Sequence, residues 1–258
     1  MDAETPKPVD LSLPQAFLLL ATNDQNGKPE VPLFALRTAV AGAVLAELDL
    51  LGAIELQGKR VRATGIAPVT DYQHELELIR SKSRAHTPKW WVSVLESRAE
   101  VLRVYEGLVS LGIVEHVGEK HLGRFRAVRY PEKDHAPEGA LLNRIQAAFN
   151  GASSNLEAPD TTATTATGAA GAGAADGGTP GAAEPGANTP DAKPVSKAPD
   201  ARTIVLIALL QASGLLPKLF PEADRIRASE LSKDYWPSRA VEDELRMIRL
   251  AEEEAANL

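Results

Sequence analysis

The stretch that decides the fold is LRVYEGLVSLGIVEHVGEKHLGRFRAVRY, residues 102–130. Its first part places apolar side chains three and four positions apart, until Leu111 and Gly112 interrupt the pattern. Two short runs then flank a polar turn, and their apolar residues nearly alternate. Helical spacing followed by alternation is typical of a helix that leads into a β-hairpin. We therefore predict a helix-to-hairpin unit at this place.

A weaker copy of the same unit lies upstream. Residues 39–51 have a helical pattern, Gly52 breaks it, and residues 53–64 can fold back as a second hairpin. Ser12 and Gln15 have the spacing of a capping box, which predicts a first helix that ends before the turn formers at 23–27. Further helices are predicted, in chain order, at residues 36–51, 71–83, 90–95, 98–111, 141–150, 202–212 and 239–256.

One long segment has a composition that cannot form a core. Residues 151–200 contain only small, polar and charged residues and proline, apart from Leu156 and Val195. Such a segment cannot bury enough apolar surface to offset about 1–2 kcal/mol of backbone entropy per residue. We therefore predict a disordered insertion here, rich in Ala, Gly, Thr and Pro, and a disordered tail at 1–10.

The remaining residues are expected to form one domain. The predicted helix at 36–51 is apolar nearly all round and rich in small residues, which indicates a central position. The helix at 202–212 is equally apolar and, with one amphipathic neighbour, would make too small a core alone. We therefore expect residues 11–150 and 201–258 to fold together. The predicted class is mainly α, a single-domain helical bundle surrounded by amphipathic helices, with one or two short β-hairpins.

Composition excludes several classes of function. The chain has 258 residues, no cysteine and a formal charge of −7, which argues against disulfides, thiolate chemistry and nonspecific coating of nucleic acid. Residues 1–10 do not form a signal peptide, and the longest apolar run, 204–210, is too short to span a bilayer. The histidines are scattered, and no phosphate-binding loop or nucleophile motif occurs. We expect no catalytic residue, no cofactor and no metal ligand.

Several motifs resemble those of the Golgi phosphoprotein 3 family. They occur in the family's order on both sides of the low-complexity segment, and the last is the most specific. The motifs are Gly42-x-x-Leu45-x-Glu47-Leu48, Leu51-Gly52-x-Ile54-x-Leu56, Leu108-Val109-x-x-Gly112-Ile113-Val114, and Asp200-x-Arg202 followed by Leu206-Ile207-x-Leu209-x-x-Ala212-Ser213.

The resemblance implies a fold and a function. Members of this family form a mostly helical domain with a projecting β-hairpin, and the eukaryotic ones are non-enzymatic peripheral membrane adaptors that bind phosphatidylinositol 4-phosphate. Since the composition looks bacterial, we expect an adaptor without a trafficking role, placed in the cytoplasm and on the inner face of the membrane. The expected partners are an anionic phospholipid headgroup, the membrane surface and a partner protein, with no nucleic acid.

The family's headgroup pocket can be placed by spacing. Its tryptophan falls at Pro32, its helix arginine at Ala41, and its paired arginines at Arg98 and Val101, so only Arg98 keeps the family residue. Two other arginines are positioned to compensate, because an arginine fork donates two parallel hydrogen bonds to phosphate. The predicted headgroup-binding residues are Arg98, Arg37 and Arg103.

The second hairpin is predicted to face the membrane. Leu122 and Phe125 would enter the lipid interface, while nearby cations, each worth about 1 kcal/mol near an anionic surface, would meet the headgroups. The predicted membrane-facing residues are Lys120, Leu122, Arg124, Phe125 and Arg126, with Arg129 beyond them. Two alternatives are a solvated hairpin with Phe125 and Val128 packed inward, and a homo-oligomer formed through the hairpin.

An alternative from another class is a winged-helix-like nucleic-acid-binding or regulatory module, because a wing is also a basic hairpin after a helix. Lys59, Arg60 and Arg62 would then contact phosphates. The acidic total charge and the few base-reading side chains at 98–111 argue against this alternative.

Overall fold

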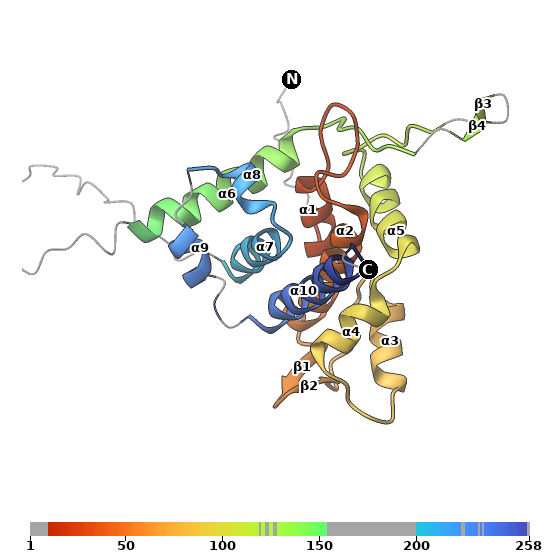
Figure 1. The fold of residues 1–258 in the computed structure, drawn as a ribbon, viewed down its shortest axis with the longest axis vertical. Coiled ribbons are helices and arrows are strands. Elements are labelled where there is room, and N and C mark those ends of the chain that lie inside the picture. Colours follow the sequence, from red (N-terminus) through yellow and green to blue (C-terminus); the bar gives the residue numbers. More distant parts are fainter. Residues whose placement is uncertain are drawn as a thin grey trace, which may run out of the picture.

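The computed structural model describes residues 10–118, 120–121, 124–125, 128–153, 200–222, 225–231, 233 and 235–256. The described part is mainly helical with two short antiparallel hairpins, which confirms the predicted class (Figure 1). The elements are α1 (Leu13–Leu20), α2 (Leu33–Leu50), β1 (Ile54–Gln57), β2 (Arg60–Ala63), α3 (Gln73–Ser81), α4 (Pro88–Leu95), α5 (Arg98–Ser110), β3 (Lys120–His121), β4 (Arg124–Phe125), α6 (Ala136–Ser153), α7 (Ala201–Ala212), α8 (Leu216–Leu219), α9 (Arg225–Leu231) and α10 (Trp236–Ala256).

Helix α2 lies at the centre of the molecule, as its composition predicts. It packs against α1, α4, α5, α7 and α10, which surround it in Figure 1. From Ala35 to Leu48 every residue except Arg37 is buried. Small residues allow this close packing, and at Gly42 a Cβ atom would collide with the side chain of Val241 on α10. The backbones of α2 and α10 therefore approach closely only because position 42 has no side chain.

The residues before and after the low-complexity segment share one core. The buried apolar cluster contains members from α1 and α2 and also from α7 and α10, such as Ile207 and Val241. Residues 1–9, at the position of the predicted tail, and 154–199, within the predicted insertion, lie outside the described residues. The described residues before and after the predicted insertion therefore pack around one core.

Several helices begin earlier than the sequence pattern predicts. The helix predicted from 36 begins at Leu33, the one from 141 at Ala136, and the one from 239 at Trp236. In α6 and α10 the second residue is a proline, Pro137 and Pro237 respectively. Proline suits a helix's first turn, where no N–H is needed, but it does not extend an apolar pattern. The predicted capping box of Ser12 and Gln15 is confirmed.

The two hairpins both follow a helix that ends at a glycine with positive φ. Gly52 (φ 68°) precedes β1–β2, and Gly112 (φ 74°) follows α5. In β1–β2, Ile54 pairs with Ala63 and Gln57 with Arg60. Strands β3 and β4 lie at the tip of an arm that projects from the body (Figure 1). Among the described residues, no helix is long and apolar enough to cross a membrane.

Candidate functional site

The best candidate site is a pocket of about 710 Å³ between the α1–α2 loop, the first turns of α2 and α5, and the segment 128–130. Four basic residues from these separate segments line it, together with apolar side chains and no acidic residue. We call this the cationic pocket, and its basic residues are Lys28, Arg37, Arg98 and Arg129. In a chain with a net charge of −7, such a concentration of positive charge is a local feature of this surface.

The loop that carries Lys28 is held by backbone contacts. Gly27 has φ 63°, as the Asn-Gly pair predicts, and its carbonyl accepts a hydrogen bond from the N–H of Tyr130 at 3.1 Å. A Cβ atom on Gly27 would overlap the backbone of Tyr130 and Pro131. The loop therefore lies directly against the segment that carries Arg129, and both walls of the pocket are fixed relative to each other.

The basic residues of the cationic pocket form no ion pair within the described part of the chain. Among the ion pairs of the described residues, none involves Lys28, Arg37, Arg98 or Arg129. The Nε atom of Arg37 is buried and finds no hydrogen-bond partner in the described part of the chain. A buried donor without a partner is unfavourable, so a movement of the Arg37 side chain that gives this atom an acceptor would be stabilising.

Two stacked tyrosines form the inner wall. The rings of Tyr105 and Tyr130 lie 4.0 Å apart and nearly parallel. Tyr105 shares a hydrogen bond of 2.7 Å with the hydroxyl of Thr22, and burial raises the pKa of Tyr105 to about 12. Tyr130 donates to Glu106 at 3.2 Å, and burial followed by the charge of Glu106 raises its pKa to about 12. Both phenols are therefore neutral at physiological pH and add no negative charge to the pocket.

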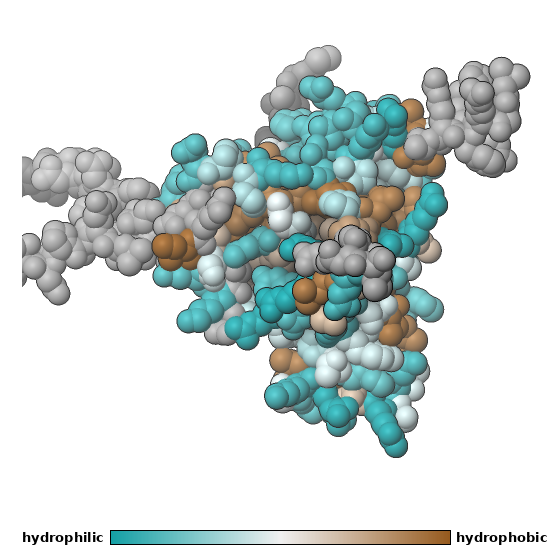
Figure 2. Space-filling view, viewed as in Figure 1, coloured by the Kyte–Doolittle hydropathy of each residue, from teal (hydrophilic) through white to brown (hydrophobic). Residues whose placement is uncertain are grey.

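Apolar side chains stand exposed at the rim. Leu33 is 66% exposed and Val128 42%, and both line the pocket. Val117, 48% exposed, pairs with Arg129 at the base of the β3–β4 arm. Figure 2 shows hydrophobic surface where this arm leaves the body. The rim thus combines apolar and basic groups, the combination that suits a membrane interface.

Comparison with known proteins identifies the family. A family model described as Golgi phosphoprotein 3 (GPP34) matches residues 13–248, nearly the whole chain. The chain belongs to the Golgi phosphoprotein 3 (GPP34) family. A comparison with curated protein sequences found no significant match.

The cationic pocket coincides with the place that spacing assigns to the family's headgroup pocket. Pro32, Arg98 and Val101 all line it, and so does Arg37. Ala41 does not line it and is instead buried in the core with 1% exposure. Arg37 and Arg98 therefore line one pocket, whereas position 41, to which spacing assigns the family's helix arginine, holds a core alanine.

Arg103 lies at a different place. Its guanidinium forms ion pairs with Glu75 at 3.0 Å and Glu100 at 2.6 Å, donates to the carbonyl of Asp71, and lies over the ring of Tyr72. It lines a separate pocket that does not include Arg37 or Arg98. The structure does not bring Arg103 to the predicted headgroup site.

Two residues of the cationic pocket escaped the sequence prediction. Lys28 follows a turn, and nothing in its local sequence indicates a binding role. Arg129 was assigned to the second hairpin, whereas its bridge to Val117 places it at the arm's base, where it lines the pocket. The tip residues Leu122 and Arg126 lie outside the described residues, and so do the side chains of Lys120, Arg124 and Phe125.

The cations of the first hairpin lie apart from this pocket. Arg60 donates a hydrogen bond of 2.6 Å to the carbonyl of Ala85, while Arg62 is exposed on β2. Neither these residues nor Lys59 lines the cationic pocket. The nucleic-acid alternative, which relied on them, stays a prediction.

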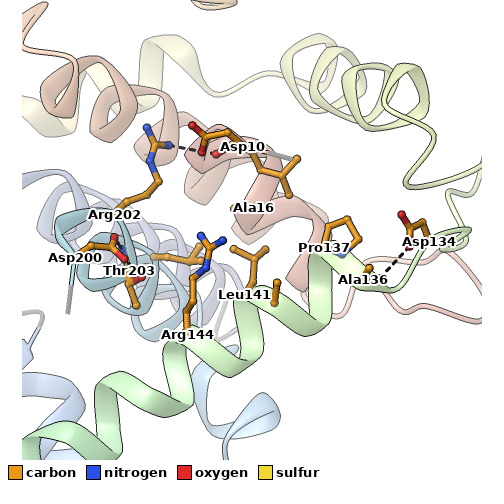
Figure 3. A pocket seen from close by; sticks show the side chains of 13 residues that line it. Asp10, Ala16, Asp134, Ala136, Pro137, Leu141, Arg144, Asp200, Arg202 and Thr203 are labelled. Carbon is orange, nitrogen blue, oxygen red and sulfur yellow. Dashed lines mark hydrogen bonds between the residues drawn. The ribbon is translucent and has the colours of Figure 1, made fainter. Parts of the chain in front are cut away.

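A second pocket, of about 290 Å³, lies between α1, α6 and α7 (Figure 3). Two of its charged groups, Asp200 and Arg202, are engaged within the protein. Asp200 caps α7 by accepting from the N–H of Thr203 at 2.8 Å, and Arg202 pairs with Glu47 at 2.7 Å. Burial alone would raise the pKa of Asp200, but the hydrogen bonds from Thr203 outweigh it and lower that pKa. The polar groups of this pocket therefore stabilise the contacts between helices, and the cationic pocket is the better candidate for a ligand site.

Proposed function

We propose that this chain is a non-catalytic peripheral membrane adaptor that binds an anionic phospholipid headgroup in the cationic pocket. The observation that carries the proposal is the convergence of Lys28, Arg37, Arg98 and Arg129 on one pocket that no acidic residue lines. A phosphorylated headgroup would neutralise these charges and accept hydrogen bonds from the guanidinium groups that line the pocket.

The apolar rim favours a lipid over a soluble phosphate compound as the source of that headgroup. Leu33 and Val128 would enter the interfacial region while the basic groups meet the headgroups. Within this class, phosphatidylinositol 4-phosphate is the proposed lipid, because the family resemblance implies it. The resemblance also supports a partner protein, which the membrane-bound chain would hold.

Flotation with liposomes tests this proposal. Three compositions are compared: neutral lipid, lipid with phosphatidylserine, and lipid with phosphatidylinositol 4-phosphate. We expect flotation with anionic lipid, strongest with the phosphoinositide. Since each cation near such a surface contributes about 1 kcal/mol, the double variant Arg37→Gln, Arg98→Gln should lower the partition coefficient roughly thirtyfold.

The matched control is Arg62→Gln, which removes one positive charge from an exposed residue of β2 outside the pocket. Its partition coefficient should change much less than that of the double variant. Equal flotation with neutral and anionic liposomes, or equal losses per charge in the pocket and control variants, would contradict the proposal. A shift of random duplex DNA at low salt that survives the pocket substitutions would favour the nucleic-acid alternative.

A further inference from the structure

Four potential metal ligands come together beside the cationic pocket. Asp24 belongs to the α1–α2 loop, Glu132 and His135 to the segment before α6, and Glu138 to the first turn of α6. One donor atom from each lies within 4.8 Å of the others. The set therefore contains three carboxylates and one imidazole around a common point.

Two of these carboxylates are buried and incompletely satisfied. Glu138 is only 5% exposed, and its Oε2 atom is buried without a hydrogen-bond partner. The Glu132 side chain is 9% exposed, and its Oε1 atom is also buried without a hydrogen-bond partner. Its other oxygen, Oε2, lies 2.9 Å from Nδ1 of His135. In the described part of the chain, no lysine or arginine pairs with Asp24, Glu132 or Glu138. Buried carboxylate oxygens require a cation or a proton.

The backbone holds this donor set in place. The N–H of Glu132 donates to the carbonyl of Asp24 at 2.9 Å, so the two segments that supply ligands are joined directly. The N–H of Gly139 donates to the carbonyl of His135 at 3.0 Å and fixes the start of α6. A donor set held by the backbone needs little rearrangement on binding, which favours affinity.

We propose that Asp24, Glu132, His135 and Glu138 bind a divalent transition-metal ion of the zinc class. Carboxylate oxygen and imidazole nitrogen are zinc ligands, and four protein ligands complete its preferred coordination. Calcium prefers six to eight oxygen ligands, and magnesium keeps several waters and does not favour imidazole. With metal–ligand distances of about 2.0–2.2 Å in tetrahedral geometry, two donors lie about 3.3–3.6 Å apart, against separations of up to 4.8 Å here. The observed set therefore closes around an ion with small side-chain movements.

Calorimetric titration of the full chain tests this proposal, after removal of any affinity tag and dialysis against a chelator. Zn²⁺ should bind at one ion per chain, more tightly than Ca²⁺ or Mg²⁺, and should raise the midpoint of thermal unfolding. Glu138→Gln and His135→Ala should each weaken Zn²⁺ binding by at least about tenfold. His135 is 65% exposed at its side chain, so its replacement should leave the fold intact.

The matched control is Glu115→Gln, which removes a carboxylate that is 58% exposed and outside the donor set. Its affinity for Zn²⁺ should equal that of the parent chain. The proposal fails if the parent binds no stoichiometric Zn²⁺, if both ligand variants bind it unchanged, or if Ca²⁺ or Mg²⁺ binds more tightly. This inference does not depend on the proposed membrane function, because liposomes play no part in the measurement.

Discussion

Arg202 forms a bidentate ion pair with Glu47, which precedes the low-complexity segment, whereas Arg202 follows it. Nη1 of Arg202 lies 2.7 Å from Oε2 of Glu47, and Nη2 lies 3.0 Å from Oε1. The same Oε2 atom accepts from the N–H of Leu13 at 2.7 Å. The pair therefore joins the start of α1, the end of α2 and the start of α7. Glu47 and Arg202 each belong to a motif that resembles those of the family.

Replacing Arg202 should strongly destabilise the fold. In Arg202→Met, Glu47 stays buried at 5% exposure without its counter-charge. Breaking a buried pair in this way costs about 3–5 kcal/mol, and we expect the lower end because the Arg202 side chain is 34% exposed. Urea unfolding measures the change. Arg246→Met, at an exposed residue of α10, is the control and should change stability by less than about 0.5 kcal/mol. Similar losses in both variants would refute a structural role for the pair.

Gly42 should not tolerate alanine, although alanine favours helices by about 1 kcal/mol. A Cβ atom there collides with Val241, so Gly42→Ala should lower the free energy of unfolding by about 1–3 kcal/mol. The comparison is Gly139→Ala in α6, where the nearest atom to the new Cβ lies 3.8 Å away and the substitution should be neutral or stabilising.

Adding Val241→Ala to Gly42→Ala should recover part of the loss, because the smaller side chain makes room for the new methyl group. Thermal unfolding of the four proteins in this cycle gives the interaction energy between the two positions. Strictly additive effects would show that the two helices do not meet through this contact.

Sequence reasoning located most of the helices because their signals are local, but it predicted neither of the two short helices α8 and α9. Signals between residues a few positions apart predicted the cap at Ser12, the central helix α2 and the glycine before each hairpin. The structure contains all three features. The predicted starts of α6 and α10 lie several residues after the observed ones. Both helices have a proline in the first turn, Pro137 and Pro237, and proline does not belong to the apolar pattern from which the starts were predicted.

The sites were harder to foresee because their residues converge from separate segments. Family spacing indicated Arg98, and Arg37 was added as a neighbour that could compensate for Ala41; both line the cationic pocket. Lys28 reaches the same pocket because Gly27 contacts Tyr130, a contact between segments far apart in the sequence. Local sequence likewise gives no sign that His135 meets Asp24. Both sites form where the α1–α2 loop contacts the segment between β4 and α6. A contact between segments so far apart in the chain leaves no periodic pattern in the sequence.

Arg103 provides a direct contrast with the pocket arginines. Arg103→Gln leaves Glu75 and Glu100 side by side and largely buried, and burial already raises the pKa of Glu100. We expect a loss of about 1–2 kcal/mol of stability, discounted because the Arg103 side chain is 42% exposed. Liposome flotation of the folded variant should match that of the parent chain. A flotation loss as large as that of Arg98→Gln would place Arg103 in the headgroup site after all.

Glu138 should make the metal-free protein less stable as pH rises. Burial, followed by the charges of Asp24 and Glu132, raises the pKa of Glu138 from 4.5 to about 9 in the folded chain. The folded state therefore holds this proton more tightly than the unfolded state. The resulting stabilisation is complete below about pH 4.5 and is lost progressively as pH rises to about 9.

Comparison with Glu138→Gln isolates this effect, because glutamine stays neutral throughout. In the presence of a chelator, the free energy of unfolding of the variant minus that of the parent should increase steadily between pH 5 and pH 9. Urea unfolding at several pH values measures this difference, and Glu115→Gln, which removes an exposed carboxylate, should follow the parent. A difference that stays constant with pH would mean that Glu138 is ionised in the folded metal-free chain and that another group balances its charge.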